Sequence, residues 1–204
     1  MKIAVIGGGG VRSMFLAKSL AQGSEELGFD EIVFMDNDEK KLNIYGRMSA
    51  QLVKTLHPGL DFKLTTDPVE AVKDADYIIT TIRVGGDDMR IRDEKAALAK
   101  HLLGQETTGA AGFSFAMRSV PALAEYCELA KKYASPDVKI FNFTNPAGVV
   151  SQTLRDMGMT SLTVSATHPA ACCTPLPNCT AWSRTRSPAT ATASTTCRSL
   201  KASS

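Results

Sequence analysis

The sequence has no run of 18 apolar residues, the length that a membrane-spanning helix needs. Its first 20 residues carry glycines where a secretory signal would have its apolar core, so we expect a cytoplasmic protein with no membrane contact. The formal net charge is only +2 and no basic stripe is present, so we expect no nucleic-acid partner. These absences leave a small molecule as the partner to consider.

The C-terminal part of the chain lacks whole residue types. Residues 159–204 contain no Asp, no Glu and no Gly, and no apolar period of 2 or 3.6 persists there. Four of the five cysteines lie in this part, namely Cys172, Cys173, Cys179 and Cys197. Such a composition is typical of a disordered linker, and the cysteine spacing is not that of a paired zinc motif. We therefore predict a domain over residues 1–158 and a largely unstructured tail over residues 159–204.

The N-terminus is rich in what the tail lacks. A short apolar run over residues 2–6 is followed by four glycines at 7–10 and then by an amphipathic segment. This order predicts the strand, tight turn and helix of a dinucleotide-binding fold. Glycines let the backbone turn sharply and approach a pyrophosphate, which then faces the helix N-terminus. Because Ser13 stands where a third Gly or Ala is usual, an ordinary strand-to-helix turn is the alternative.

The rest of residues 1–158 alternates between apolar runs and amphipathic segments. We predict strands at 2–6, 31–35, 62–66, 76–82 and 138–143 and helices at 12–22, 38–55, 68–72 and 115–133. This alternation predicts an α/β fold, a doubly wound parallel sheet of the Rossmann type. The charged run 87–94 is interpreted as a solvated helix face.

Two polar residues stand at the carboxyl ends of predicted strands, where this fold binds its ligands, and a glycine-rich segment lies between them in the sequence. Asp36 ends the second strand, where an acidic residue holds the adenosine ribose; the alternative role is a helix cap. Residues 104–112 hold three glycines and predict a non-helical cradle beside a cofactor. Asn145 follows the fifth strand, where its amide can hold a substrate hydroxyl or cap the next helix.

Five motifs in this order resemble glycoside hydrolase family 4, nearest to its 6-phospho-β-glucosidase branch. They are Gly7–Gly10, Ile82–Gly86, Arg90–Glu94, Gly104–Gly109 and Phe143–Ala147. Gly10 departs from the family, which usually has Ser there.

The resemblance implies NAD and a divalent metal, typically Mn²⁺, and a family that departs from the usual two-carboxylate mechanism. NAD takes a hydride from C3 of the sugar, a tyrosine removes the C2 proton, the aglycone leaves from C1, and the hydride then returns. The metal polarises the C2 and C3 oxygens. The implied partner is a small phosphorylated glycoside, and the intact protein is expected to be a homo-oligomer.

The resemblance also assigns site residues. Those expected to contact NAD are Gly7, Gly8, Gly9, Gly10, Val11, Arg12, Asp36, Asn37 and Thr81. Arg90 and Asn145 would contact substrate. Gln105, Glu106 and Thr107 would lie near the nicotinamide and the metal.

The family's metal-binding Cys and His motifs and its tyrosine base are missing from this chain. Back-translating residues 159–204 and starting each codon one base earlier allows strings that look like these motifs, with a cysteine at position 166 and a histidine at position 196. Our hypothesis is that this segment is an out-of-frame reading, that His168, Cys172 and Cys173 are not ligands, and that the chain as written is inactive. The alternatives are a 2-hydroxy-acid dehydrogenase of the lactate or malate type and a non-catalytic NAD-binding fragment.

Overall fold

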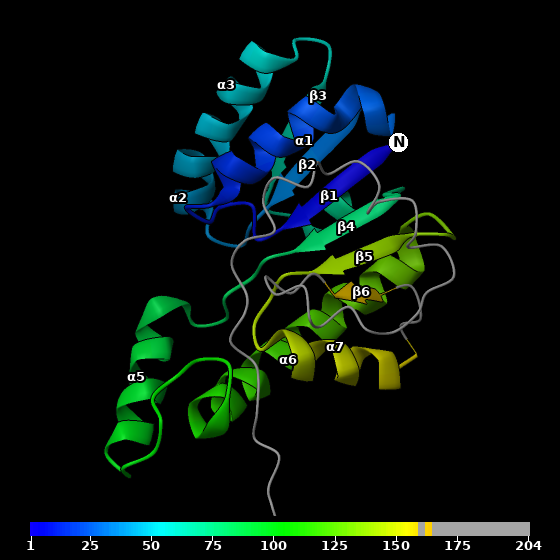
Figure 1. Ribbon diagram of the computed structural model, residues 1–204. Coiled ribbons are helices and arrows are strands. Elements are labelled where there is room, and N and C mark those ends of the chain that lie inside the picture. The colour runs from blue at the N-terminus through cyan, green and yellow to red at the C-terminus, as the bar shows by residue number, and fades with distance from the viewer. Residues whose placement is uncertain (159–161, 165–204) are drawn as a thin grey trace, which may run out of the picture. The chain divides into compact units, whose positions relative to one another are not determined.

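The computed structural model describes residues 1–158 and 162–164 and contains a six-stranded sheet in the order β3-β2-β1-β4-β5-β6 (Figure 1). Every neighbouring pair of strands is parallel. The strands are β1 (Lys2–Ile6), β2 (Glu31–Met35), β3 (Asp61–Thr65), β4 (Tyr77–Thr80), β5 (Lys139–Asn142) and β6 (Leu162–Val164). This strand order, which reverses at β1 and β4, is that of a doubly wound nucleotide-binding sheet, so the predicted fold class is confirmed.

Helical segments connect the strands on both faces of the sheet (Figure 1). They are α1 (Ser13–Leu27), α2 (Glu39–Lys41), the π-helix η1 (Leu42–Gly46), α3 (Arg47–Leu56), α4 (Pro68–Val72), α5 (Gly86–Leu98), α6 (Gly109–Tyr133) and α7 (Ala147–Asp156). Alternate residues of each central strand point to opposite faces, so the sheet has two separate cores. Ala4 and Ile6 of β1 pack with α4, α6 and α7, whereas Ile3 and Val5 pack with α1, η1 and α3.

The two predicted N-terminal helices differ from those observed. The first runs on to Leu27 and ends where Gly28 adopts a left-handed φ of 71°. The second, predicted as one helix over 38–55, contains the π-helix η1. Gly46 ends this π-helix against β3, and a Cβ there would lie 2.8 Å from Leu64 Cδ2. Such a close approach of helix and strand is tertiary information that helical periodicity does not carry.

The glycine-rich segment 104–112 is only partly the predicted loop. Helix α6 begins at Gly109, so the expectation of a non-helical backbone is wrong for residues 109–112. Gly112 lies so close to the preceding loop that a Cβ would come within 2.6 Å of the carbonyl carbon of Thr107. The glycine is therefore required by close packing of the loop on the helix rather than by an irregular backbone.

Helices α5 and α6 form a hairpin beyond the carboxyl ends of the strands (Figure 1). Of the α5 residues only Ala97 is buried, in agreement with the predicted solvated, charged helix face. Exposed apolar side chains gather at the tip of this hairpin: Leu98 at the end of α5, Leu102 and Leu103 in the connecting segment, and Phe113 and Met117 on α6.

The outer strand β3 is bordered by β2 on one side and is charged along its length. Lys63 lies at its middle and forms 2.9 Å ion pairs with Glu31 of β2 and with Asp61 of its own strand. The strand is accordingly the least buried of the first five.

The structure describes three residues beyond the predicted boundary at residue 158. Leu162–Val164 forms β6 and pairs with Ile140–Asn142 of β5. The remaining predictions for the tail, those for His168, Cys172, Cys173 and the recovered motifs included, fall outside the described residues. Among the residues that the structure describes, no helix is both long and apolar enough to cross a membrane.

Candidate functional site

In the glycine turn after β1, Gly7 and Gly8 have no room for a side chain. Gly7 has a φ of +98°, and a Cβ there would lie 2.6 Å from the carbonyl oxygen of Thr81. A Cβ on Gly8 would lie 2.6 Å from Phe34 Cβ. The N–H groups of Gly7 and Gly8 both donate to the carbonyl oxygen of Met35 at 2.8 Å. The turn is therefore pressed against the ends of β2 and β4.

Asp36 connects the end of β2 to the same turn. Its Oδ2 accepts a hydrogen bond from the Gly9 N–H at 2.9 Å, and its Oδ1 accepts from the Asp38 N–H at 3.0 Å. Asp38, not Asp36, caps the following helix, since its carboxylate accepts from the Lys41 N–H at 3.1 Å. Asp38 therefore fills the helix-cap role that was the alternative for Asp36.

The N-terminus of α1 is left without a cap. Arg12 occupies the N-cap position with no side-chain hydrogen bond to the helix, and the first turn contains no acidic residue. The backbone N–H groups of Val11 and Arg12 have no hydrogen-bond acceptor among the described residues. Helix N-termini carry unsatisfied donors and a partial positive charge, so this one is suited to an anion.

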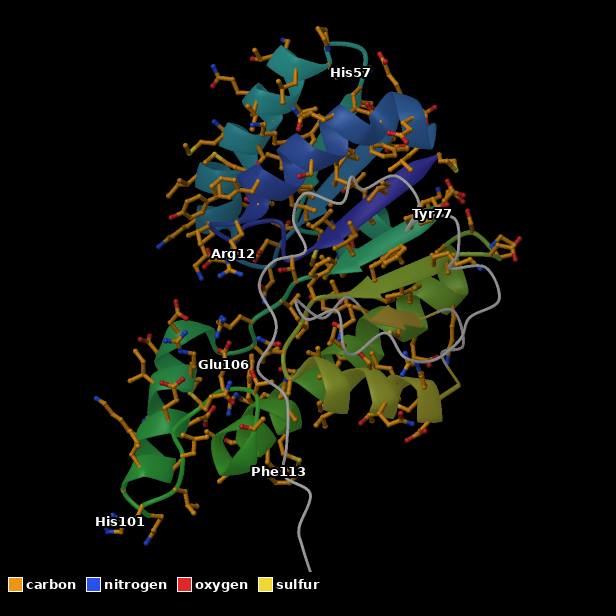
Figure 2. All side chains as sticks on the ribbon, in the orientation of Figure 1. Arg12, His57, Tyr77, His101, Glu106 and Phe113 are labelled. Carbon is orange, nitrogen blue, oxygen red and sulfur yellow. The ribbon has the colours of Figure 1, made fainter. Side chains whose placement is uncertain are left out.

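The other predicted cofactor residues lie around this turn. Gly10, Val11 and Arg12 are exposed, and Figure 2 shows Arg12 at the turn between β1 and α1. Asn37 is exposed next to Asp36. Thr81 is exposed after β4, and its N–H donates to the carbonyl oxygen of Ile6 at 2.8 Å.

A second cluster centres on Glu106, in the loop before α6 (Figure 2). One oxygen of its carboxylate accepts from Nη1 of Arg83, which follows β4. The other oxygen accepts from Nδ2 of Asn145, which follows β5, at 3.2 Å. Glu106 thereby joins three segments that are far apart in the sequence.

The environment of Glu106 keeps it ionised. Burial by itself would raise the pKa of Glu106, but the hydrogen bond and charge of Arg83, the hydrogen bond from Asn145 and the charge of Arg90 outweigh it. The pKa of Glu106 therefore lies below its ordinary value. Its side chain is only 19% exposed, and a carboxylate with so little water around it is costly unless cations and hydrogen-bond donors pair with it.

Arg90 and Asn145, the two predicted substrate residues, both act on this carboxylate. The Arg90 Nε lies 3.5 Å from Glu94 Oε1, one turn along α5, and Arg90 reaches Glu106 only through its charge. The peptide bond between Asn145 and Pro146 is cis.

Gln105 and Thr107 serve the loop itself. The Gln105 Oε1 accepts from the N–H groups of Thr107 at 2.8 Å and Thr108 at 2.7 Å. It also accepts from the Thr108 hydroxyl at 3.0 Å. The Gln105 amide oxygen is thus used in holding the turn that presents Glu106.

Sequence reasoning missed a buried polar network behind Asn145. Asn142 is fully buried; its Oδ1 accepts from Thr80 Oγ1 and from the Thr144 N–H, each at 2.9 Å. Its Nδ2 donates to Ser151 Oγ at 3.0 Å. Thr144 Oγ1 in turn accepts from the Ile82 N–H at 3.1 Å. The network fixes the ends of β4 and β5 and the start of α7 relative to one another.

A third cluster, also missed, holds the α5–α6 hairpin together. The Asp93 carboxylate on α5 accepts from the Arg118 guanidinium and, at 2.8 Å, from the Ser114 hydroxyl on α6. Burial by itself would raise the pKa of Asp93, but the hydrogen bonds from Arg118 and Ser114 and the charge of Arg118 outweigh it and lower the pKa. Spacing along the chain gave no signal for this contact, because the partners are 21 and 25 residues apart.

No metal site can be built from the described part of the chain. Within residues 1–158 and 162–164 there is no group of three or more His, Cys, Asp or Glu side chains placed to hold an ion.

Comparison with known proteins assigns this architecture to a family. The family model described as family 4 glycosyl hydrolase matches residues 2–175. The chain belongs to family 4 of the glycosyl hydrolases. The match begins at β1 and includes both the glycine turn and the Glu106 cluster.

Two curated members of family 4 illustrate the similarity. The 6-phospho-beta-glucosidase BglT of Thermotoga maritima is 42% identical over 158 residues, which are 76% of this chain and 36% of BglT. A 6-phospho-alpha-glucosidase of Leptotrichia buccalis is 35% identical over 153 residues, which are 75% of this chain and 34% of that protein. The chain thus spans about a third of the length of these family 4 relatives.

A solved family 4 structure has the same fold. The T. maritima 6-phospho-beta glucosidase, in a structure with manganese, NAD+ and glucose-6-phosphate, superposes with a TM-score of 0.77 at 36% identity. The superposition covers 83% of this chain and 41% of that one.

Proposed function

We propose that this chain carries the NAD-binding part of a family 4 glycosidase that hydrolyses phosphorylated glycosides. The observation that carries the proposal is the pairing of an uncapped α1 N-terminus with a glycine turn whose third glycine is held by Asp36. This is the arrangement that binds a dinucleotide pyrophosphate and its ribose.

The residues present fit NAD. Side chains at Gly7, Gly8 and Gly9 would collide with neighbouring atoms at 2.6 to 2.8 Å, so the turn is a bare backbone surface that a pyrophosphate can approach. The free N–H groups of Val11 and Arg12 would donate to the phosphates, and Asp36 would accept from the ribose hydroxyls. NAD when bound supplies a hydride acceptor.

The Glu106 cluster is our candidate for the sugar site. It lies, like the glycine turn, at the carboxyl ends of the strands, where this fold binds its ligands. Asn145 would accept a hydrogen bond from a sugar hydroxyl, and Arg90 would attract an anionic substrate by its charge. Thr107 and Gln105 would shape the loop beside the nicotinamide.

We assign the finer specificity to 6-phospho-β-glucosides. The support is the higher identity to BglT, 42%, than to the Leptotrichia 6-phospho-alpha-glucosidase, 35%. The family membership argues against the lactate or malate dehydrogenase alternative. The non-catalytic NAD-binding fragment is the second candidate, because the described residues carry the nucleotide turn but no cluster of three or more His, Cys, Asp or Glu side chains placed to hold an ion.

The described residues do not provide a donor set for Mn²⁺. We propose that the coding sequence of residues 159–204 is out of frame and that the chain as written is inactive. Sequencing the coding DNA across codons 155–165 tests this. An unambiguous in-frame reading that matches related genomic copies would overturn it.

Nucleotide binding is tested on the chain as it stands. We expect NAD to bind in isothermal titration calorimetry and Asp36→Asn to weaken the affinity about 10-fold or more, since one charged hydrogen-bond acceptor is lost. Asp88→Asn on exposed α5 is the matched control and should leave the affinity unchanged. Absence of NAD binding by the wild-type chain would refute the proposal.

Hydrolysis is tested on a frame-restored chain. A chromogenic 6-phospho-β-glucoside, NAD, Mn²⁺ and a thiol should give product release, which should stop when NAD is removed. NAD binding with no hydrolysis after restoration would favour the non-catalytic fragment.

A further inference from the structure

We propose that Arg83 is a positioning residue that acts through Glu106 to fix the orientation of the Asn145 side-chain amide. This inference rests on the proposed function, in which Asn145 binds a sugar hydroxyl. Arg83 itself need not touch the sugar.

The geometry separates the two partners of Glu106. Arg83 Nη1 donates to Oε2, and Asn145 Nδ2 donates to Oε1 at 3.2 Å. An ionised carboxylate has only acceptor atoms, so the amide of Asn145 must turn its NH₂ group toward it. The Asn145 Oδ1 is then directed away from Glu106 and is free to accept a hydrogen bond.

Arg83 provides the direct cationic contact to this carboxylate. Arg90 adds its charge, but within the described residues the hydrogen bond to Glu106 from a cation comes from Arg83 alone. The Glu106 side chain is only 19% exposed, so without Arg83 its Oε2 would lose the donor that holds it in place. A carboxylate without that donor is free to rotate away from Asn145 Nδ2, so the orientation of the Asn145 amide is no longer fixed.

Arg83 is itself held in place from two helices. Its guanidinium carbon lies 5.8 Å from the centre of the Phe115 ring on α6, and its Nε lies 3.7 Å from Asp87 Oδ1 on α5. A cation over an aromatic ring is an attractive contact, and the planar guanidinium suits it. The series from Phe115 through Arg83 and Glu106 to Asn145 therefore connects the α5–α6 hairpin with the end of β5.

The test uses the ¹⁵N-labelled full chain and follows the side-chain amide signals of Asn145 by NMR. These signals are assigned as the pair that disappears in Asn145→Ser. In Arg83→Met we expect them to move toward the positions of solvent-exposed asparagines. Arg83→Lys, which keeps the charge, should restore part of the shift. Arg92→Met on the exposed face of α5 is the matched control and should leave the signals in place.

Two results would overturn the inference, and a third result would overturn only the proposed function. Unchanged Asn145 signals in Arg83→Met, with an unfolding midpoint equal to that of Arg92→Met, would overturn it. If Arg83→Met does not fold, Glu106→Gln is the substitute, and unchanged Asn145 signals there would also overturn it. Absence of NAD binding by the wild-type chain would refute the proposed function. It would leave the Asn145 result intact, because the amide signals are recorded without any ligand.

Discussion

The carboxylate of Asp36 accepts a hydrogen bond from the backbone N–H of Gly9 across 2.9 Å, 27 residues away in the sequence. The bond fixes the distance between the glycine turn and the end of β2. A ribose hydroxyl that binds to Asp36 would therefore meet a carboxylate whose position is already set, and pre-positioned groups bind at lower entropic cost.

The first prediction concerns Gly9, the donor of this hydrogen bond. In Gly9→Ala the new Cβ would lie 2.8 Å from Asp36 Oδ2 and would push the carboxylate away. We expect NAD affinity to fall about 10-fold, which corresponds to about 1.4 kcal/mol. Titration calorimetry measures it. Gly23→Ala within α1 is the control, because a Cβ there lies away from the turn and meets only Leu27 Cδ1, at 3.5 Å; equal losses in the two variants would contradict the explanation.

The second prediction concerns the loop that presents Glu106. In Gly112→Ala the Cβ would lie 2.6 Å from the Thr107 carbonyl carbon, so the loop must move away from α6. We expect a lower free energy of unfolding in urea and faster amide exchange at residues 105–108.

The matched change for Gly112→Ala lies in α7. Gly148 has no atom within 4 Å of its Cβ position, so Gly148→Ala should stabilise the protein by about 0.5 kcal/mol through helix propensity. A destabilised Gly148→Ala would show that the glycine effects reflect something other than space.

The third prediction concerns the buried amide of Asn142. Asn142→Ala leaves the Thr80 and Ser151 hydroxyls without their partner inside the core. We expect a loss of about 1–3 kcal/mol in the free energy of unfolding, the usual cost of buried unpaired polar groups. Thr153→Ala on α7, which breaks only an exposed bond to the Val149 carbonyl, should cost far less. Similar losses for both would remove the argument for a special role of the network.

The fourth prediction concerns acid and the α5–α6 hairpin. The pKa of Asp93 lies below its ordinary value of 3.8 in the folded protein, so its pairing with Arg118 is fully stabilising above the unfolded pKa. That contribution is lost as the pH falls through the lower folded pKa. From pH 6 to pH 2 the α5–α6 hairpin should therefore lose stability more steeply in wild type than in Asp93→Asn. The backbone amide signals of the hairpin, followed by NMR, measure this loss. Parallel curves for the two proteins would contradict this assignment.

Local patterns predicted the elements that depend on local chemistry. Apolar runs located strands over 2–6 and 31–35, and the helix predicted over 68–72 is α4. The π-helix was not predicted, and the close approach of its last residue, Gly46, to Leu64 of β3 is a contact that helical periodicity does not indicate.

From position along the chain alone, without the family resemblance, the site was predictable only where residues follow strands. Asp36 and Asn145 were found by their position at strand ends, and Arg83 had the same signal after β4. What joins Arg83 to Asn145 is Glu106, 23 residues from one and 39 from the other, and no spacing rule contains that contact. The Asn142 network was hidden for the same reason, since its Thr80 partner is 62 residues away.

The ion pairs of Lys63 have a consequence for how copies of this chain meet. An outer strand with free N–H and C=O groups is a template onto which another chain can add a strand. At β3 an incoming strand would have to strip water from Lys63 and its two carboxylate partners, Glu31 and Asp61. The charged group around Lys63 therefore opposes the growth of an intermolecular sheet from β3.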